Sequence, residues 1–250
     1  MEQQVIYSIQ HITKEFPGVK ALDDVSIDVR RGEILALVGE NGAGKSTLMN
    51  ILSGAYAPSS GKLVYEGQEL TALTPDRAQK LGIAMIHQEL SLSNALSVAE
   101  NIFEGHLPKT PLGLVDYRRL LRDSKVLLEE VGLPHLDPRT LVRDINVSQQ
   151  QMVEIAKALS LDAKFLILDE PTQGIDIGAK NEIYEIIDEM VRQGASVIMV
   201  SSEMQETISL CDRILVMYEG QIAGELYHRD ATEQNIVTLM AGQQLAQSAN

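Results

Sequence analysis

The sequence predicts an α/β fold in which helices flank a parallel core sheet. Three observations predict it: apolar and polar residues alternate near the N-terminus, helical periodicity dominates about residues 95–160, and strands alternate with helices from residue 165 onward. Alternating strands and helices are typical of a parallel sheet. We expect the β-rich start to form an antiparallel N-terminal subdomain and the helical stretch to form an inserted α-helical subdomain. We expect a single domain over residues 1–242 and a flexible polar tail at 243–250.

The N-terminal elements follow from period-two alternation. Apolar residues at every second position over 5–9 and 25–29 predict two antiparallel strands, with a turn at Phe16-Pro-Gly18. Residues 62–66 predict a further short strand. The apolar run 33–38 predicts a buried strand, which the helical stretch 46–52 follows.

The remaining elements alternate in type. We expect helices at 75–81, 117–131, 148–161, 178–193 and 203–210, and strands at 83–86, 165–168, 196–200, 213–217 and 221–225. The helices at 117–131 and 148–161 form the core of the inserted subdomain.

The composition excludes several classes of function. A net charge of −14 argues against nucleic acid as a partner, because phosphate backbones bind basic surfaces. The single cysteine, Cys211, excludes internal disulfides. We expect no signal peptide, and no apolar run approaches the ~18 residues that a spanning helix needs. Any contact with a membrane is therefore expected to pass through a partner.

One short segment carries the strongest chemical signal. Residues 39–46 fit the pattern G-x-x-x-x-G-K-[ST] between a predicted strand and a predicted helix, which is the setting of a phosphate-binding loop. Glycines let successive N–H groups point inward around an anion, and the helix N-terminus adds partial positive charge. Lys45 would reach the β- and γ-phosphates, and Ser46 would ligate Mg²⁺. The expected phosphate-binding residues are Gly39, Glu40, Asn41, Gly42, Ala43, Gly44, Lys45, Ser46 and Thr47.

Two carboxylates complete the predicted chemistry. The apolar strand 165–168 runs directly into Asp169 and Glu170. Many strands end in acidic turns, but after a phosphate loop this pair indicates a hydrolytic site: Asp169 would hold the hydration shell of Mg²⁺ and Glu170 would polarise the attacking water.

Together, the phosphate loop, Gln88, the stretch 148–158 and Leu168-Asp-Glu-Pro-Thr172 resemble the ATPase subunit of ATP-binding cassette (ABC) transporters over nearly the whole chain. The resemblance implies ATP and Mg²⁺ as cofactors. It implies that Phe16 stacks on adenine, for which a core residue of the hairpin is the alternative. It also implies that Gln88 contacts Mg²⁺ and the attacking water.

The resemblance narrows to importers of ribose, galactose, xylose and related sugars, which carry two cassettes in tandem. The front of the chain is similar to their first cassette, and the part from about residue 166 is similar to their second. An engineered hybrid, a deletion product and a natural divergent single cassette all fit this pattern. The implied protein is peripheral, on the cytoplasmic face of the inner membrane.

The same resemblance implies several partners. Membrane permease subunits would receive the cassette, with the surface around 88–104 contacting a permease helix; an ordinary amphipathic surface helix at 97–103 is the alternative. A sugar-binding protein would act indirectly. A second cassette or a second copy of the chain would complete the ATP site with its signature residues, which here are Asn146, Ser148 and Gln149.

Two departures from the family pattern point to slow hydrolysis. The usual signature Leu-Ser-Gly-Gly-Gln is Ile145-Asn-Val-Ser-Gln149 here, and the switch histidine expected after strand 196–200 is Ser202. A degenerate cassette that binds ATP but hydrolyses it poorly is therefore an alternative. A soluble cassette acting on ribosomes or DNA is disfavoured, because the chain is acidic and has no long coiled-coil insertion.

Overall fold

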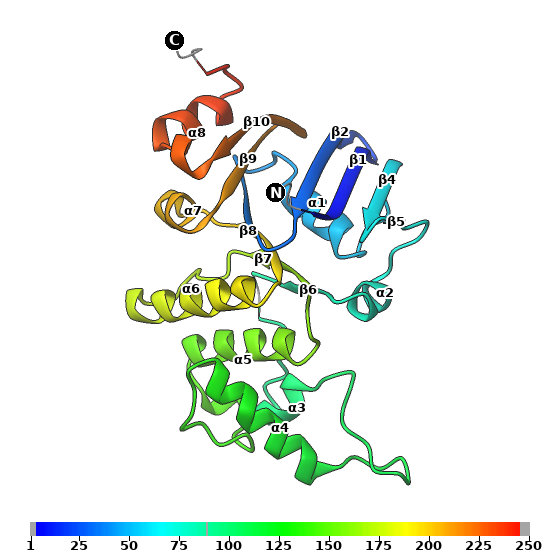
Figure 1. Cartoon of the computed structure of the whole chain (residues 1–250), viewed down its shortest axis with the longest axis vertical. Coiled ribbons are helices and arrows are strands. Elements are labelled where there is room, and N and C mark those ends of the chain that lie inside the picture. Colours follow the sequence, from blue (N-terminus) through cyan, green and yellow to red (C-terminus); the bar gives the residue numbers. More distant parts are fainter. Residues whose placement is uncertain (1–3, 89, 246–250) are drawn as a thin grey trace.

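The computed structural model describes residues 4–88 and 90–245 and contains two sheets (Figure 1). The four-stranded sheet has the order β2-β1-β4-β5 and the six-stranded sheet the order β10-β9-β3-β8-β7-β6. The strands are β1 (Val5–Phe16), β2 (Val19–Arg30), β3 (Ile34–Gly39), β4 (Ser60–Tyr65), β5 (Gln68–Glu69), β6 (Ile83–Ile86), β7 (Phe165–Asp169), β8 (Ser196–Val200), β9 (Arg213–Tyr218) and β10 (Gln221–Tyr227).

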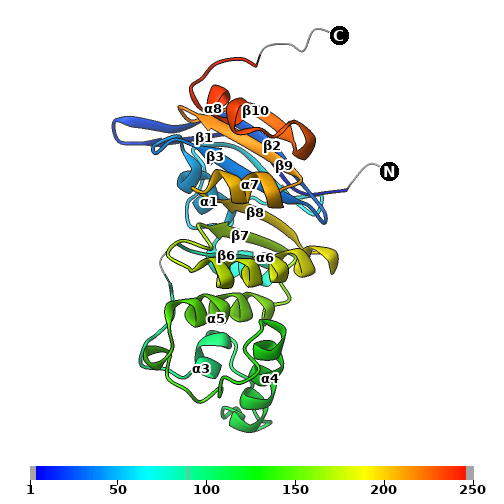
Figure 2. The same ribbon diagram turned by 90° about the vertical axis from the view of Figure 1, so that its left-hand side faces the viewer.

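Some helices pack beside the larger sheet, and others extend the molecule at its two ends. In Figures 1 and 2, α3, α4 and α5 form one end of the molecule and α8 lies at the other. The α-helices are α1 (Lys45–Leu52), α2 (Pro75–Lys80), α3 (Val98–Ile102), α4 (Tyr117–Glu130), α5 (Val147–Leu159), α6 (Ile177–Arg192), α7 (Met204–Leu210) and α8 (Glu233–Met240), and short 3-10 helices lie at Val142–Asp144 and His228–Asp230.

The predicted α/β class is confirmed. Five neighbouring strands of the larger sheet, from β9 through β3, β8 and β7 to β6, pair in parallel, and β10 adds an antiparallel edge. The smaller sheet is antiparallel throughout and contains the N-terminal hairpin. Its turn lies between Phe16 and Val19, as the Pro-Gly pair predicts.

Both faces of the larger sheet are buried, which explains its nearly continuous apolar strands. In β3, Ile34, Ala36 and Val38 belong to one hydrophobic core together with residues of α5, α6 and α8. The alternate residues Leu35 and Leu37 belong to a second core, shared with α1 and the smaller sheet. The central strands are thereby fixed between two layers.

Most predicted elements agree with the structure to within a few residues, but the short strand β5 was not predicted, and two helices differ from expectation. Helix α3 is short, and four of its five residues are buried, so it is not the amphipathic surface helix considered as an alternative at 97–103. Helix α8 was not predicted, because only Ile236 and Leu239 are buried in it. Residues 243–245 follow α8 without regular structure, and the rest of the expected tail lies outside the described residues.

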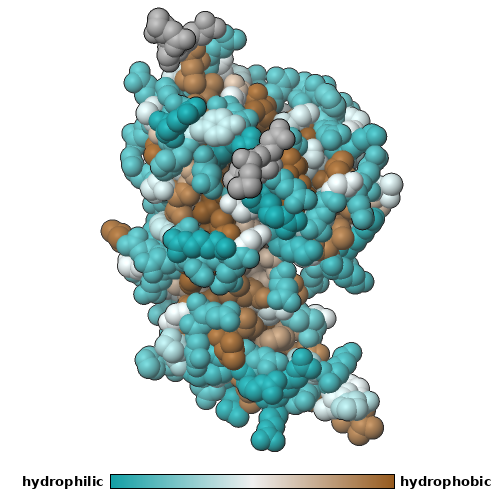
Figure 3. Space-filling model, in the orientation of Figure 1, coloured by the Kyte–Doolittle hydropathy of each residue, from teal (hydrophilic) through white to brown (hydrophobic). Residues whose placement is uncertain are grey.

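The face of the molecule seen in Figure 3 is largely hydrophilic, and smaller apolar patches lie among the hydrophilic residues. Leu112 and Leu114, in the loop between α3 and α4, are 88% and 68% exposed.

None of the helices in the part of the chain that the structure describes has both the length and the apolar character needed to cross a bilayer.

Candidate nucleotide-binding site

The predicted phosphate loop lies where β3 passes into α1. β3 ends at Gly39 and α1 begins at Lys45, so the loop has the expected strand-to-helix setting. Gly42 and Gly44 adopt φ angles of 87° and 105°, in the left-handed region that residues with a Cβ rarely enter. The Ala43 N–H donates to the Glu40 carbonyl at 3.1 Å, which closes the turn.

The loop is also seated against two other segments. A Cβ on Gly44 would lie 2.7 Å from the Ala21 carbonyl oxygen and 2.8 Å from Leu22 Cδ2. The Gly220 N–H, which follows β9, donates to the Ala43 carbonyl at 3.1 Å. The backbone of the loop is therefore held from β2 and from the β9–β10 turn before any ligand binds.

Lys45 curls back over its own loop. Its ammonium donates to the Gly39 carbonyl at 2.7 Å and to the Glu40 carbonyl at 3.1 Å. Burial lowers the pKa of Lys45, and the negative charges of Glu170 and Asp169 oppose this shift. The ammonium and both predicted carboxylates thus share one electrostatic site.

Asp169 ends β7 beside this site. Burial raises the pKa of Asp169, while His87 and Lys45 lower it. Mg²⁺ prefers oxygen ligands and takes one or two carboxylates in addition to substrate phosphates. The Asp169 carboxylate and the Ser46 hydroxyl supply oxygen ligands at the end of β7 and the start of α1, so both fit this role.

Glu170 is held more tightly than its neighbour. Its backbone has φ 51°, a strained value for a residue with a Cβ. Its N–H donates to the Val200 carbonyl at 2.9 Å, and its carboxylate accepts from the N–H and the hydroxyl of Ser202, both at 2.9 Å. Ser202, the residue that we predict at the switch position, is therefore directed to the predicted catalytic glutamate.

Gln88 follows β6 and contacts a residue that the sequence did not single out. Its amide Nε2 donates to Gln173 Oε1 at 2.9 Å, and both side chains are exposed. Gln173 lies three residues after Glu170, so Gln88 is joined to the same strand-end loop. No local signal identifies Gln173, because the contact links segments 85 residues apart.

Phe16 lies in a small aromatic cluster at the end of β1. Its ring meets Tyr56 edge to face, with centroids 5.7 Å apart, and the Lys14 ammonium is 5.0 Å from the Phe16 centroid. Phe16 is half-buried, so part of its ring is available for stacking. Tyr56, just beyond α1, was not predicted as part of this group.

Within the described part of the chain, the predicted signature residues form hydrogen bonds locally and not with the phosphate loop. Asn146 Oδ1 accepts from the Gln149 N–H at 2.9 Å, and Gln149 Oε1 accepts from the Asn146 N–H at 3.1 Å, which is a capping box that starts α5. Ser148 donates to Asp176 at 3.4 Å. Strands β6 and β7 separate α5 from α1 in both ribbon views (Figures 1 and 2).

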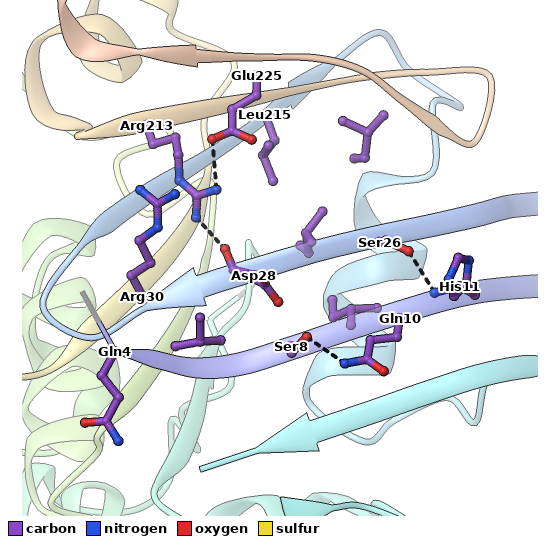
Figure 4. Close-up of a pocket in the computed structure, with 14 residues that line it drawn as sticks. Gln4, Ser8, Gln10, His11, Ser26, Asp28, Arg30, Arg213, Leu215 and Glu225 are labelled. Carbon is purple, nitrogen blue, oxygen red and sulfur yellow. Dashed lines mark hydrogen bonds and ion pairs between the residues drawn. The ribbon is translucent and has the colours of Figure 1, made fainter. Parts of the chain in front are cut away.

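A large groove of about 1190 Å³ lies elsewhere, between the β1–β2 hairpin and the β9–β10 pair (Figure 4). Arg213 in this groove binds Glu33 through two hydrogen bonds of 3.2 and 2.7 Å, and it also binds Glu225 at 3.2 Å. Arg30 packs against the Tyr227 ring and donates to its hydroxyl at 3.3 Å. Because these charges satisfy one another, we interpret the groove as part of the contact between sheets.

The fold and the phosphate loop define a P-loop nucleoside triphosphatase domain. The family model described as ABC transporter matches residues 22–173, and the chain belongs to this family. The resemblance noted in the sequence is thereby confirmed.

Its similar relatives are named as sugar-import proteins. The putative ribose/galactose/methyl galactoside import ATP-binding protein 2 of Burkholderia cenocepacia is 44% identical over 97% of this chain and 47% of that protein. Galactose/methyl galactoside import ATP-binding protein MglA 1 of Photobacterium profundum is 41% identical over 97% of this chain and 49% of that protein. The chain therefore spans about half the length of the curated relatives it matches.

Solved structures agree with the family. An ATP-binding cassette of an ABC transporter has a TM-score of 0.83 and 26% identity, over 94% of this chain and 98% of that one. A cassette in its ADP conformation has a TM-score of 0.81 and 27% identity, over 95% of each chain.

The two left-handed glycines of the loop give a matched pair of variants. Gly44→Ala places a Cβ against backbone and also keeps an unfavourable φ, whereas a Cβ on Gly42 meets nothing within 4 Å. We expect Gly42→Ala to lower the free energy of unfolding by about 1–2 kcal/mol, the cost of a left-handed residue, and Gly44→Ala to lower it clearly further. Urea unfolding of the purified variants measures both. Equal losses would show that the loop shifts freely away from Ala21.

Proposed function

We propose that the chain binds and hydrolyses ATP to drive the import of a monosaccharide through a membrane permease. The observation that carries this proposal is a phosphate loop between β3 and α1, with Asp169 and Glu170 at the end of the nearby parallel strand β7. The names of the relatives supply the sugar class. The chain matches about half of each relative. Its likeness to a first cassette before about residue 166, and to a second cassette after it, therefore stays a prediction.

Each residue has a definite task in this proposal. The loop N–H groups and Lys45 bind the phosphates, and Phe16 stacks on the adenine. Ser46, Asp169 and Gln88 hold Mg²⁺, which neutralises phosphate charge when it is bound. Glu170 orients the attacking water. Lys45 must exchange its two carbonyl partners for phosphate oxygens, which form stronger charge-assisted hydrogen bonds.

Slow turnover is part of the proposal. The Glu170 carboxylate accepts two hydrogen bonds from Ser202, so it is already engaged by the group that replaces the switch histidine. A serine side chain is shorter than an imidazole and reaches less far toward a γ-phosphate. These contacts also favour the second candidate, a cassette that binds ATP at ordinary affinity but hydrolyses it poorly.

We further propose that a second copy or a second cassette completes the site. The signature residues Asn146, Ser148 and Gln149 cap α5 or bind Asp176, and α5 lies apart from α1. A partner's signature would then enclose the γ-phosphate. The complex would lie on the cytoplasmic face of the inner membrane and take sugar from a binding protein through the permease.

A groove beside the Gln88 segment offers a place for the permease. It has a volume of about 320 Å³ and is bordered by α2, the end of β6 and α5, with Gln79, His87 and Lys157 among its lining residues. Glu100 and Glu104 suit a docking role less well. Glu100 forms the capping box of α3 with Ser97, and Glu104 pairs with Lys157 at 2.6 Å.

Loss of the Lys45 ammonium tests nucleotide binding. Lys45→Ala removes the charge that faces the phosphates, and a lost charged hydrogen bond costs about 1.5–3 kcal/mol. We expect the Kd for Mg-ATP, measured by titration calorimetry, to rise about tenfold to a hundredfold. Lys62→Ala is the control, since Lys62 is exposed and pairs with Glu69 on the smaller sheet. If Lys45→Ala binds ATP as the parent does, the assigned loop does not hold the phosphates.

Restoring the histidine tests the cause of slow hydrolysis. One preorganised donor to the transition state is worth about 10²–10³ in rate, so Ser202→His should raise the steady-state turnover number while the Kd for ATP changes little. Ser202→Ala removes the hydroxyl bond to Glu170, keeps the backbone N–H bond and adds no donor, so it should not give this gain. Combining Ser202→His with Asn146→Ser and Ser148→Gly checks whether the altered signature masks it. A parent that already turns over several times per second, with no gain from histidine, would contradict the explanation.

A charge placed in the groove beside Gln88 tests the permease contact. Gln79 is exposed in α2, and Gln79→Arg should weaken co-purification with the permease without changing ATP binding. Gln68→Arg makes the same replacement at an exposed position on β5 and should leave co-purification unchanged. Full association of Gln79→Arg would place the contact elsewhere.

A further inference from the structure

A buried carboxylate outside the proposed ATP contacts connects several segments near the site. Glu206 in α7 is 6% exposed. Its two oxygens accept hydrogen bonds from Thr172 Oγ1 at 3.0 and 2.9 Å, from Ser201 Oγ at 2.8 Å and from Lys180 Nζ at 3.0 Å. Four segments thus meet at one side chain.

Each donor belongs to a segment next to the proposed chemistry. Thr172 lies two residues after Glu170, on the loop that leaves β7. Ser201 directly precedes Ser202, on the loop that leaves β8. Lys180 lies in the first turn of α6, just beyond Asp176, which accepts from Ser148 of the signature segment.

The charge of Glu206 is retained despite its burial. Burial alone would raise the pKa of Glu206, but hydrogen bonds from its polar neighbours, among them Ser201, Lys180 and Thr172, outweigh it and hold the pKa below its usual value. A buried ion pair is weak evidence for stability, because apolar residues of similar volume often stabilise as well. Its geometric role is more specific: an ionised carboxylate accepts from several directions at once and so fixes the relative position of the loops that donate.

The contact between Glu170 and Ser202 depends on those positions. Ser202 reaches Glu170 with both its N–H and its hydroxyl, each at 2.9 Å. The two residues come from different strand-end loops, and Glu206 holds the loops together through Thr172 and Ser201. The Glu203 N–H also donates to Ser201 Oγ at 3.0 Å, so the loop after β8 is fixed on both sides of Ser202.

We propose that Glu206 is a positioning residue for ATP hydrolysis, which holds the loops of Glu170 and Ser202 in register with each other and with the start of α6. The assignment rests on the proposed function, since it concerns the hydrolytic step. Glu206 is not among the residues that we assign to the nucleotide or to Mg²⁺. Its loss should therefore change turnover and leave ATP affinity nearly intact.

Glu206→Gln tests the proposal, because glutamine keeps the size but loses the charge and half of the acceptor capacity. We expect kcat to fall about tenfold to a hundredfold, the scale of a small misplacement of reacting groups, while the KM and the Kd for ATP stay within twofold. Glu203→Gln is the matched control: Glu203 also pairs with Lys180 and loses the same charge, but its side chain contacts neither Thr172 nor Ser201. Thr172→Val, which removes one donor, should lower kcat in the same way and serves if Glu206→Gln does not fold.

Hydrogen exchange gives a readout that does not need hydrolysis. In the full chain, Glu206→Gln should speed exchange of the amides of residues 170, 172 and 173 together with those of 201–203, whereas Glu203→Gln should not. A parent without ATPase activity would overturn the proposed function, and exchange would then test only whether Glu206 holds the two loops together. Unchanged exchange overturns the role of Glu206. An unchanged kcat overturns it too, as does a parallel loss of kcat and ATP affinity.

Discussion

The parallel pairing of β9, β3, β8 and β7 is the constraint on which the rest of the site depends. Parallel strands end on the same edge of their sheet, so the loops that follow them meet there. Asp169 at the end of β7 pairs with Val200 at the end of β8, and Gly39 at the end of β3 pairs with Met217 in β9. The phosphate loop, the carboxylates and Ser202 are thereby brought to one edge from positions far apart in the sequence.

The residues that we predict as the signature segment lie away from that edge (Figure 1). The helical insertion carries the signature residues to another region of the molecule, where Asn146 and Gln149 cap α5. The same side chains that would meet a partner's nucleotide therefore have local work in the single chain. Among them, Ser148 reaches Asp176 and so connects the insertion with the start of α6.

The sequence predicts those features whose cause is local. The glycine spacing of the phosphate loop and the apolar run before Asp169 each depend on a few consecutive residues, and the structure confirms both elements. Helix α8 was missed because two buried residues do not establish a period. The contact of Gln88 with Gln173 and the Glu206 cluster could not be foreseen, since their partners lie 85 and 34 residues apart and meet only after folding. Phe16 falls between these cases: its place in the hairpin was predictable, but its contact with Tyr56 was not.

The buried pair of Glu33 and Arg213 restricts how this sequence can change over evolutionary time. The side chains of Glu33 and Arg213 are 2% and 4% exposed. Glu33 directly precedes β3, and Arg213 begins β9, the strand that pairs with β3. Replacing Arg213 alone leaves the buried Glu33 carboxylate without its ion-pair partner, which costs about 3–5 kcal/mol, out of a total stability of about 5–15 kcal/mol for a typical domain. Replacing Glu33 alone leaves Arg213 with Glu225 as its remaining partner. An apolar pair could be as stable as the ionic one, yet every single-substitution path to it passes through a weakened intermediate. The low stability of the singly substituted proteins thus favours retention of the ion pair, whether or not it is the most stable choice.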